Sequence, residues 1–421
     1  MKNRRKGVAM HQVVVTGIGI VSPLGTSVEE FCRRMFAAES GLVDIRNGFV
    51  GPNFPVPAAG RVPDERLVAP EALQRLGHKN SLKSHIFAAM ATEEALQALP
   101  RDTPVDAIAY GTTDGISFDL IKSSFRKFDP ATFDWDATRA ETTLELLRDM
   151  VALHGNGHIE DQDLFTLNNA CVSSNQAIGL ALQRIRSGMW RRAIVGGVDA
   201  RCTDENIMNF HMLGALSVAN VPAAEASRPF SKSRCGFVRG EGAGTLILES
   251  LEEAQARGAK ILGKISGYAA SSDAFRLTDG RTDAKAAIHA MAGAIADARL
   301  DTQQIDAVSA HGTSTQMNDR LETMALKQVF GPQAYRMPVV ALKSQIGHAT
   351  VAAGALQAIA TLRMLSDQRL APTINYKDID PECDLDYVPN QSRPAQLNAI
   401  LSNSFGFGGQ NACVVFQRYA S

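Results

Sequence analysis

The chain has 421 residues, 45% of them hydrophobic and 21% charged, so it can bury a core of domain size and is not a disordered segment. Lys and Arg number 43 and Asp and Glu number 44, which gives a formal net charge of -1. This balance excludes a global field that would draw the protein onto nucleic acid or an anionic membrane.

The cysteines lie far apart and form no CxxC pair, which favours free thiols in a reducing compartment over a disulfide framework or a zinc site. The basic first residues lead into a short strand-like run, and no uncharged stretch reaches the roughly 18 residues that a membrane span needs. We therefore expect a cytoplasmic protein with no membrane contact. The six thiols belong to Cys32, Cys171, Cys202, Cys235, Cys383 and Cys413.

Short β-branched runs alternate with longer helical patterns, which is typical of an α/β fold whose sheets are covered by helices. The predicted strands are Val13–Thr16, Ala107–Tyr110, Leu164–Leu167, Ala193–Val195, Gly244–Glu249, Ile305–Ala310, Val339–Leu342, Ala399–Leu401 and Ala412–Phe416. The predicted helices include Ser27–Ala38, Ala137–Leu153, Ile178–Ser187, Ala284–Ala298, Arg320–Val329 and Val351–Ser366. The helix Ala137–Leu153 lies in an unusual charged and aromatic region, residues 118–163, and its mixed face suits a subunit contact.

Two stretches of the sequence look alike. FTLNNACVSSNQAIGLALQRIRSG from Phe165 and VVALKSQIGHATVAAGALQAIATLRML from Val339 each read as a strand, a small-residue loop with one reactive side chain, and an apolar helix. This echo indicates a duplicated core. We expect an N-terminal half, residues 1–256, that carries the cysteine, and a C-terminal half, residues 257–421, that carries two histidines and a lysine.

Cys171 is predicted to lie where a strand ends and a helix begins. Unpaired N–H groups and partial positive charge at a helix N-terminus favour a thiolate and bind an anion beside it. A nucleophile is one interpretation, and a buried structural cysteine is the other.

His311, His348 and Lys343 also follow predicted strands, and open α/β sheets bind ligands at the carboxyl ends of their strands. A histidine of this kind, taken alone, is more often a satisfied loop or core residue than a catalytic one. Together with Cys171 they favour nucleophilic catalysis with neutral imidazole donors.

Several motifs, in this order, resemble the β-ketoacyl-acyl carrier protein synthases of the type I/II ketosynthase group, which have the thiolase fold. The resemblance runs from about Gln12 to Tyr419, and the set of one cysteine and two histidines with flanking glycines makes it specific. The motifs are GIGIVSPLG from Gly17, NNACVSS around Cys171, ASRPFSKSRCGFVRGEGAG from Ala226, SAHGTST around His311, LKSQIGHATVAAGA around Lys343 and His348, and NSFGFGGQN from Asn403.

The resemblance implies a five-layered αβαβα thiolase-like fold with two similar halves. It implies that Cys171 accepts an acyl group from carrier-protein phosphopantetheine, while its own N–H and that of Phe407 hold the oxyanion. His311 and His348 would then hold the thioester oxygen of a malonyl group as it loses CO2, and the resulting carbanion would attack the acyl-cysteine.

Other roles are implied in the same way. Lys343 would order the site with Glu322, supported by Asp319, and Phe407 would act as a gate whose flanking glycines let it swing. Substrate contacts would come from Thr313, Thr315 and Phe237. The alternatives stay open that Thr313 and Thr315 cap the following segment and that Phe407 is a core residue.

The resemblance also implies an acyl carrier protein as partner, a homodimer or a ketosynthase heterodimer, and no metal or redox cofactor. The sequence departs from the family pattern at Asn168–Asn169, Cys235, Gln316, Gln410 and residues 117–163. Because of these departures, the sequence does not determine the length or structure of the acyl chain. They favour a specialised or type II polyketide ketosynthase over a housekeeping fatty-acid enzyme. Two alternatives remain: a non-catalytic, chain-length-factor-like partner subunit, and a thiolase that acts on acyl-CoA.

Overall fold

The computed structural model describes residues 10–46, 51–76, 82–113 and 142–420. Ten strands form one sheet in the order β11-β10-β14-β15-β9-β1-β8-β6-β4-β5. Within the described ranges, no helix is both long enough and apolar enough to cross a membrane.

The sheet consists of two five-strand sets with the same internal order. The strands of the first set are β1 (Val13–Val21), β4 (Ala107–Gly111), β5 (Leu164–Leu167), β6 (Arg192–Asp199) and β8 (Gly242–Ser250). Those of the second are β9 (Gly263–Ser272), β10 (Ala307–Ser309), β11 (Val339–Val340), β14 (Ala399–Gly406) and β15 (Gln410–Gln417). In each set the first strand in sequence lies beside the last, then come the fourth, the second and the third, and β1 pairs with β9 where the sets meet. This repetition supports the proposal that the chain is a duplication divided near residue 257.

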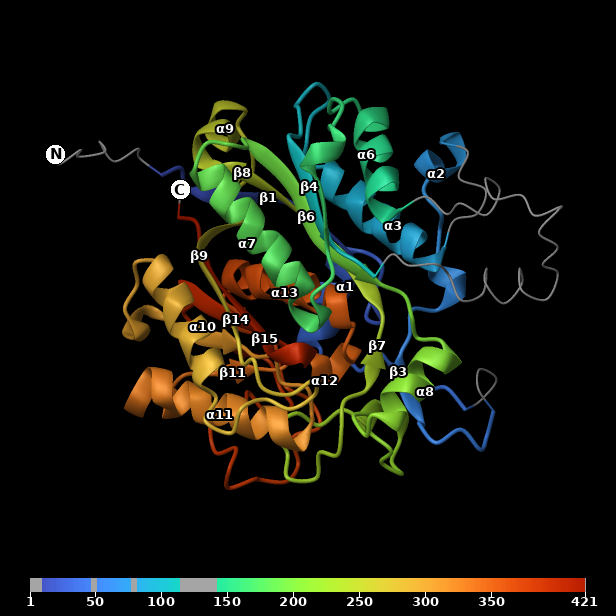
Figure 1. Ribbon diagram of the computed structural model, residues 1–421, viewed down its shortest axis with the longest axis vertical. Helices are drawn as coiled ribbons and strands as arrows, with labels where there is room; N and C mark the ends of the chain where they lie inside the picture. The colour runs from blue at the N-terminus through green and yellow to red at the C-terminus, as the bar shows by residue number, and fades with distance from the viewer. Residues whose placement is uncertain (1–9, 47–50, 77–81, 114–141, 421) are drawn as a thin grey trace.

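Helices form three layers around the two sets of strands (Figure 1). The central layer is α7 (Ser173–Arg186) and α13 (Ala353–Asp367), which pack against strands of both sets. One outer layer is α3 (Lys83–Leu96) with α6 (Thr143–His154), and the other is α10 (Lys285–Asp297) with α11 (Gln316–Phe330). The predicted five-layered αβαβα arrangement is thus confirmed.

Shorter elements complete the described chain. The helices are α1 (Val28–Phe36), α2 (Glu71–Arg75), α8 (Asp204–Met212), α9 (Leu251–Ala256) and α12 (Lys343–Ile346). The small strands are β2 (Leu42–Asp44), β3 (Ala58–Gly60), β7 (Arg239–Gly240), β12 (Arg369–Leu370) and β13 (Arg393–Pro394). Two single turns of 3-10 helix, η3 (Ala170–Val172) and η7 (Thr350–Ala352), lead into α7 and α13.

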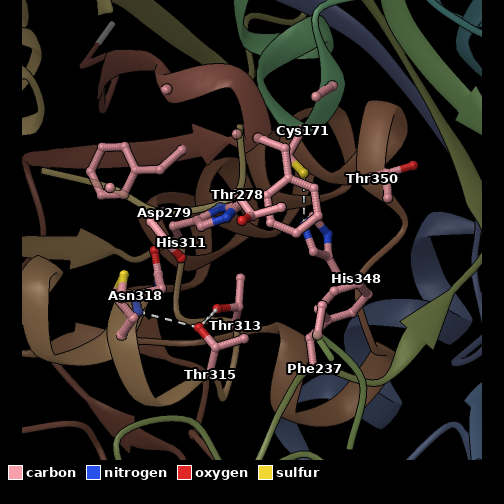
Figure 2. Close-up of a pocket in the computed structure, with 18 of the residues that line it drawn as sticks. Cys171, Phe237, Thr278, Asp279, His311, Thr313, Thr315, Asn318, His348 and Thr350 are labelled. Atoms are coloured by element: carbon pink, nitrogen blue, oxygen red, sulfur yellow. Dashed lines mark hydrogen bonds between the residues drawn. The ribbon is translucent and has the colours of Figure 1, made fainter. Parts of the chain in front are cut away.

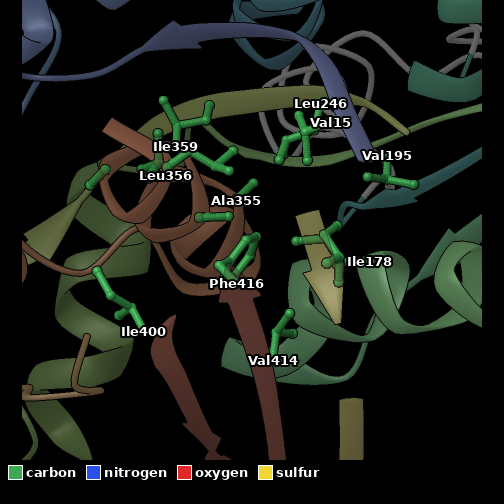
Figure 3. Packing of buried hydrophobic residues seen from close by; sticks show 14 of the residues in the cluster. Val15, Ile178, Val195, Leu246, Ala355, Leu356, Ile359, Ile400, Val414 and Phe416 are labelled. Carbon is green, nitrogen blue, oxygen red and sulfur yellow. The ribbon is translucent and has the colours of Figure 1, made fainter. Parts of the chain in front are cut away.

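Both faces of the large sheet are buried, so its strands are apolar on both sides. Leu246 and Leu248 of β8 face the central helices, whereas Ile247 between them packs in the outer core with α3. Val414 and Phe416 of β15 meet the same central core from the opposite side, as Figure 3 shows. Truncating one such side chain to Ala typically costs about 2–5 kcal/mol, so the central core fixes the relative position of the two sets.

The predicted end of the first strand at Thr16 is wrong, because β1 continues to Val21. A Cβ at Gly17 would lie 2.6 Å from the Ala95 carbonyl oxygen of α3, and one at Gly19 would lie 2.0 Å from that of Ala91. These glycines extend the strand under a helix that approaches closely, and they do not end it.

Other boundaries also differ from the prediction. Strand β9 was not predicted, since its small residues lack the usual β-branched pattern. Helices α7 and α11 begin earlier than expected because polar residues of their first turns interrupt the apolar periodicity. For the expected helix Ala137–Leu153, the described part is α6, which begins after its cap Thr142, and residues 114–141 lie outside the described ranges.

Candidate active site

Cys171 lies in a tight turn between β5 and α7. The turn begins at Ala170, whose φ of 50° is in the left-handed region. The Ser173 hydroxyl accepts a hydrogen bond from the Asn169 N–H at 2.9 Å and donates one to the Ala170 carbonyl at 2.7 Å. These bonds fix the strained turn and hold the thiol at the start of α7, only 6% exposed.

His348 lies in the corresponding turn before α13. Helix α12 ends at Gly347, whose φ is 71°, and the next N–H, from His348, donates to the Val238 carbonyl at 2.8 Å. A Cβ at Gly347 would lie 2.9 Å from that carbonyl oxygen, so the close approach favours glycine. His348 Nε2 lies 3.0 Å from Cys171 Sγ, within hydrogen-bond distance.

His311 reaches the same point from the loop after β10. The backbone N–H groups of His311 and Gly312 both donate to the carboxylate of Glu322 at 2.8 Å, which fixes the loop. The rings of His311 and His348 are 5.3 Å apart and nearly perpendicular. The structure thus brings the reactive atoms of Cys171, His311 and His348 within 4.8 Å of one another, as Figure 2 shows.

Both imidazoles are neutral. Burial lowers the pKa of His311 and His348 well below the usual value, and the charge of Lys343 lowers both further. Neither Nδ1 has a hydrogen-bond partner among the described residues, and a buried N–H without an acceptor is costly. The single proton of each ring is therefore favoured at Nε2, where His348 faces the sulfur.

The expected thiolate is not favoured in the resting site. Burial raises the pKa of Cys171 to about 11, although Lys343, Arg239 and the Phe407 N–H lower it. Sequence reasoning weighed the helix N-terminus and missed the larger cost of burying a charge. The resting pair of Cys171 and His348 is therefore neutral.

Lys343 is fully enclosed at the start of α12, which follows β11. Burial lowers its pKa to about 8, whereas Glu322 raises it. Its ammonium donates to Gln357 Oε1 at 3.2 Å. Gln357 in turn donates to the Ser309 and Asn403 carbonyls at 2.7 and 3.1 Å, so the lysine is tied to β10 and β14.

Asp319 and Glu322 support the histidine loop from α11. Asp319 accepts hydrogen bonds from the N–H groups of Phe230 at 2.7 Å and Thr313 at 3.0 Å. Burial raises the pKa of Asp319 to about 6, against the lowering effect of these bonds. Glu322 also accepts a bond from Asn403 Nδ2 at 3.0 Å.

The site opens into a cavity of about 740 Å³ lined by Cys171, both histidines, and the predicted substrate contacts Thr313, Thr315 and Phe237. The Thr313 and Thr315 hydroxyls lie 3.0 Å apart. Thr315 also accepts from the Asn318 N–H at 3.3 Å, so the alternative that it caps the following helix holds as well. Phe237 packs against the edge of His348 at 5.3 Å.

Phe407 lines the cavity and is half-buried, with its backbone N–H directed at Cys171. Gly408 and Gly409 after it have φ of 79° and 75°. The Gly408 N–H donates to the Leu277 carbonyl at 2.6 Å, which ties this turn to the loop after β9.

Comparison with known proteins decides the family. The model of the β-ketoacyl synthase N-terminal domain matches residues 164–254, and that of the C-terminal domain matches residues 262–377. The chain is 36% identical to 3-oxoacyl-[acyl-carrier-protein] synthase 2 of Synechocystis, over 97% of this chain and 98% of the relative. It is 33% identical to a putative polyketide beta-ketoacyl synthase 1 of Streptomyces halstedii, over 96% and 97%.

The chain belongs to the β-ketoacyl synthase family. Its fold superposes on a beta-ketoacyl synthase from Burkholderia phymatum with a TM-score of 0.87 at 30% identity, covering 98% of this chain and 100% of that one. It superposes on the ishigamide ketosynthase/chain length factor with a TM-score of 0.83 at 33% identity, with the same coverage. The predicted family and its thiolase-like fold are confirmed.

The β-ketoacyl synthase site holds one thiol and two imidazoles, which are groups that can ligate a metal ion. Tetrahedral zinc with bond lengths of about 2.3 Å to sulfur and about 2.0 Å to nitrogen holds these ligands about 3.5 Å apart. The 3.0 Å between Cys171 Sγ and His348 Nε2 fits a direct hydrogen bond instead.

Sequence reasoning missed the charged residues beneath the β-ketoacyl synthase site. Arg239 and Asp199 are both fully buried and form an ion pair at 2.7 Å. Thr350, two residues after His348, donates to Asp199. The signal was an arginine within the apolar and glycine-rich run GFVRGEGAG, where a buried cation needs an acidic partner.

Proposed function

We propose that this protein is a β-ketoacyl-acyl carrier protein synthase that joins a cysteine-bound acyl group to a malonyl group with loss of CO2. The observation that carries the proposal is the meeting of one thiol and two neutral imidazoles within 4.8 Å, at the start of a helix and inside a cavity. A nucleophile and two uncharged N–H donors are what acyl transfer and enolate stabilisation need.

In the first half-reaction, Cys171 Sγ attacks the carbonyl of an acyl thioester. The Phe407 N–H points at Cys171, and the Cys171 N–H lies just before α7, so we expect both to support the tetrahedral oxyanion. The new carbon–sulfur bond forms as the pantetheine sulfur departs. That sulfur takes up the thiol proton, so the enzyme gains an acyl group and no charge.

In the second half-reaction, a malonyl thioester occupies the emptied pantetheine position. The Nε2–H groups of His311 and His348 donate to its thioester oxygen and stabilise the enolate that forms as the carbon–carbon bond to CO2 breaks. The enolate carbon attacks the acyl-cysteine carbonyl. The Cys171 thiolate leaves and is reprotonated, which frees a β-ketoacyl thioester on the carrier.

The surrounding residues take supporting roles in this proposal. Lys343 adds positive charge near the developing enolate, and Glu322 orients the His311 loop and offsets the lysine charge. Thr313 and Thr315 face the cavity at hydrogen-bonding distance from each other, which suits contacts with pantetheine amides. Phe407 is the gating aromatic, because its glycine-flanked turn can swing.

The partner and substrate follow from the relatives. One fold neighbour is the ketosynthase of a type II PKS in complex with its acyl-carrier protein, with a TM-score of 0.86 at 31% identity, and another is a ketosynthase/chain length factor. We propose that this chain accepts its substrates on a carrier protein in the cytoplasm, without metal or redox cofactor, and works as a homodimer or a ketosynthase heterodimer. Fatty-acid and polyketide relatives both match, so the proposal names a reaction and leaves the pathway open.

The test is reconstitution of the full chain with acyl-carrier protein and malonyl-carrier protein, followed by measurement of released CO2 and of the carrier product by mass spectrometry. We expect malonyl-dependent CO2 and a product with two more carbons. Condensation of two acyl-CoA molecules without malonyl donor would identify a thiolase instead. A chain inert alone and active only as the companion of a second ketosynthase would identify a partner subunit.

A further inference from the structure

Beneath the active site, the structure holds a buried ion pair that the proposed reaction does not use. Arg239 of β7 and Asp199 at the end of β6 are both inaccessible to solvent, and Nη2 of the arginine donates to Oδ1 of the aspartate at 2.7 Å. Taking two charges out of water is costly, so such a pair is weak support for stability by itself. Its contacts indicate another purpose.

The Arg239 guanidinium joins three segments around the active site. Nη1 donates to the His348 carbonyl at 3.0 Å and to the Gly240 carbonyl at 2.9 Å. Nε donates to Asn206 Oδ1 of α8 at 2.9 Å. Because the planar group fixes all these directions at once, it holds the backbone of His348 relative to β6 and α8.

Asp199 completes the link on the other side of the histidine. It accepts a hydrogen bond from the hydroxyl of Thr350, two residues after His348, and one from the Arg201 N–H at 3.0 Å. Although burial opposes ionisation, Arg239 and Arg201 hold the pKa of Asp199 at about 2. The aspartate is therefore charged, and the His348 turn is held by the pair from both ends.

We propose that Arg239 and Asp199 are positioning residues of the active site, which fix the His348 turn and set the electrostatic field at Cys171. The catalytic consequence rests on the proposed function. The effect on the thiol does not, because it is a property of the resting protein.

Arg239 and Asp199 have opposite charges, so their separate effects on Cys171 can be measured. After burial, which raises the pKa of Cys171, the positive charge of Arg239 lowers it and the negative charge of Asp199 raises it. Removing the Arg239 charge should therefore raise the pKa of the Cys171 thiol, and removing the Asp199 charge should lower it. Both changes nevertheless weaken the same ion pair. The charged and titratable groups near Cys171 include Lys343 of α12, His348, His311 after β10, Glu322 of α11, Asp199 of β6, Arg239 of β7 and Arg201, which lines the same cavity.

The other end of β6 offers a matched control. Arg192 pairs with Glu249 at 2.7 Å, and both side chains are at most 2% exposed. Arg192 and Asp199 lie seven positions apart along β6, or about 23 Å at about 3.3 Å per residue. The Arg192–Glu249 pair is also a buried ion pair between an arginine and a carboxylate, but it lies far from the active site.

The experiment is alkylation of the intact protein with iodoacetamide over a range of pH, with the modified peptides resolved by mass spectrometry. The thiolate is the reacting form, so each unit of pKa changes the Cys171 rate about tenfold at pH below the pKa. Cys235 lines the same cavity and is exposed, and serves as an internal control. The variants are Arg239→Met, Arg239→Lys, Asp199→Asn and Arg192→Met.

We expect Cys171 alkylation to slow at least about fivefold in Arg239→Met and to speed up at least about twofold in Asp199→Asn, with Cys235 unchanged. Arg239→Lys keeps the positive charge, so Cys171 should be alkylated within about twofold of the original rate. The variant should nevertheless lose condensation activity, because the His348 carbonyl is no longer held. Arg192→Met should lose stability without a change at Cys171. The proposal would be overturned if the Cys171 alkylation rate changed in the same direction in Asp199→Asn and Arg239→Met, or changed in neither. If Arg239→Met does not fold, Asp199→Asn and Arg239→Lys provide the test.

Discussion

The Cys171 turn and the His348 turn are two versions of one backbone feature. In each, a three-residue 3-10 turn, η3 or η7, leads directly into a central helix. Each begins with a non-glycine residue at positive φ, Ala170 at 50° and Thr350 at 31°. Counted from those residues, Val351 takes the place of Cys171 and Asn168 takes the place of His348. The halves share a backbone and differ in the side chains they place on it.

The difference teaches how one fold supplies two chemistries. The thiol of the first turn lies just before α7, whereas the imidazole lies three positions earlier in the equivalent register of the second half and reaches across to the thiol. The two regions touch, since the Ser174 hydroxyl in the first turn of α7 donates to the Val351 carbonyl of η7. A Cβ at Gly354 would lie 2.5 Å from Asn175 Oδ1, so close packing of the two helices holds the turns together.

Removal of the Cys171 thiol should have the largest effect on activity of the changes considered in the two turns. Cys171→Ala should lower acyl uptake by at least about three orders of magnitude, because Val351, the counterpart in the other half, cannot replace a nucleophile. Intact-protein mass spectrometry after incubation with acyl-carrier protein measures this. Cys32→Ala, a buried cysteine outside the cavity, is the matched control and should still gain the acyl mass. Full uptake by Cys171→Ala would contradict the account.

Removal of the imidazole tests the other turn. His348→Ala should lower malonyl decarboxylation about 10²–10³-fold, since one preorganised N–H donor to the enolate oxygen is lost. Asn168→Ala, at the equivalent position of the first half, should change it less than about tenfold. Release of CO2 from malonyl-carrier protein by the acylated enzyme is the measurement. Equal losses in the two variants would show that the halves are not divided in this way.

Ala170 and Thr350, the residues at positive φ that begin the two turns, should differ in how much they contribute to the free energy of unfolding. Thr350→Val should lower the free energy of unfolding by about 1.5–3 kcal/mol, because the buried Asp199 carboxylate loses a donor. Ala170→Gly should change it by less than about 1 kcal/mol, since relief of the left-handed strain offsets the greater freedom of the unfolded chain. Urea unfolding of both variants measures the difference. A larger loss for Ala170→Gly would reverse the assignment of strain and hydrogen bonding.

The smallest expected effect is an absence of titration. Burial first, and Lys343 next, hold the pKa of both histidines well below 6.5, so they stay neutral on mild acidification. The decarboxylation rate of the acylated enzyme should therefore be flat between about pH 6.5 and about pH 7.5, a range above the Asp319 pKa of about 6 and below the Lys343 pKa of about 8. A pH series of CO2 release from the acylated protein measures it. An inflection close to the pKa of free imidazole would contradict the neutral pair.

Much of this architecture could be predicted from local sequence. The strand and helix patterns around Cys171 and His348 predict a duplicated core, because buried strands and apolar helices leave a clear periodicity, and the repeated strand order supports this proposal. The same patterns failed at Gly17 and Gly19, where the need of α3 to approach the strand overrides the usual meaning of glycine. Close packing between distant segments leaves no local signal.

The site shows the same limit. The meeting of Cys171, His311 and His348 could be predicted because each lies in a distinctive small-residue loop. The Arg239–Asp199 pair joins residues 40 positions apart that no motif links. The raised pKa of Cys171 could not be predicted either, since burial is a property of the assembled cavity and not of the loop.

One single-turnover measurement tests most directly whether the two turns act on one bond. Protein acylated at Cys171 is mixed with malonyl-carrier protein, and the loss of acyl mass from the protein is followed together with CO2. The account predicts equal rates and one CO2 for each acyl group lost, with a β-ketoacyl carrier as product. Acyl loss without CO2, or CO2 without acyl loss, would contradict it.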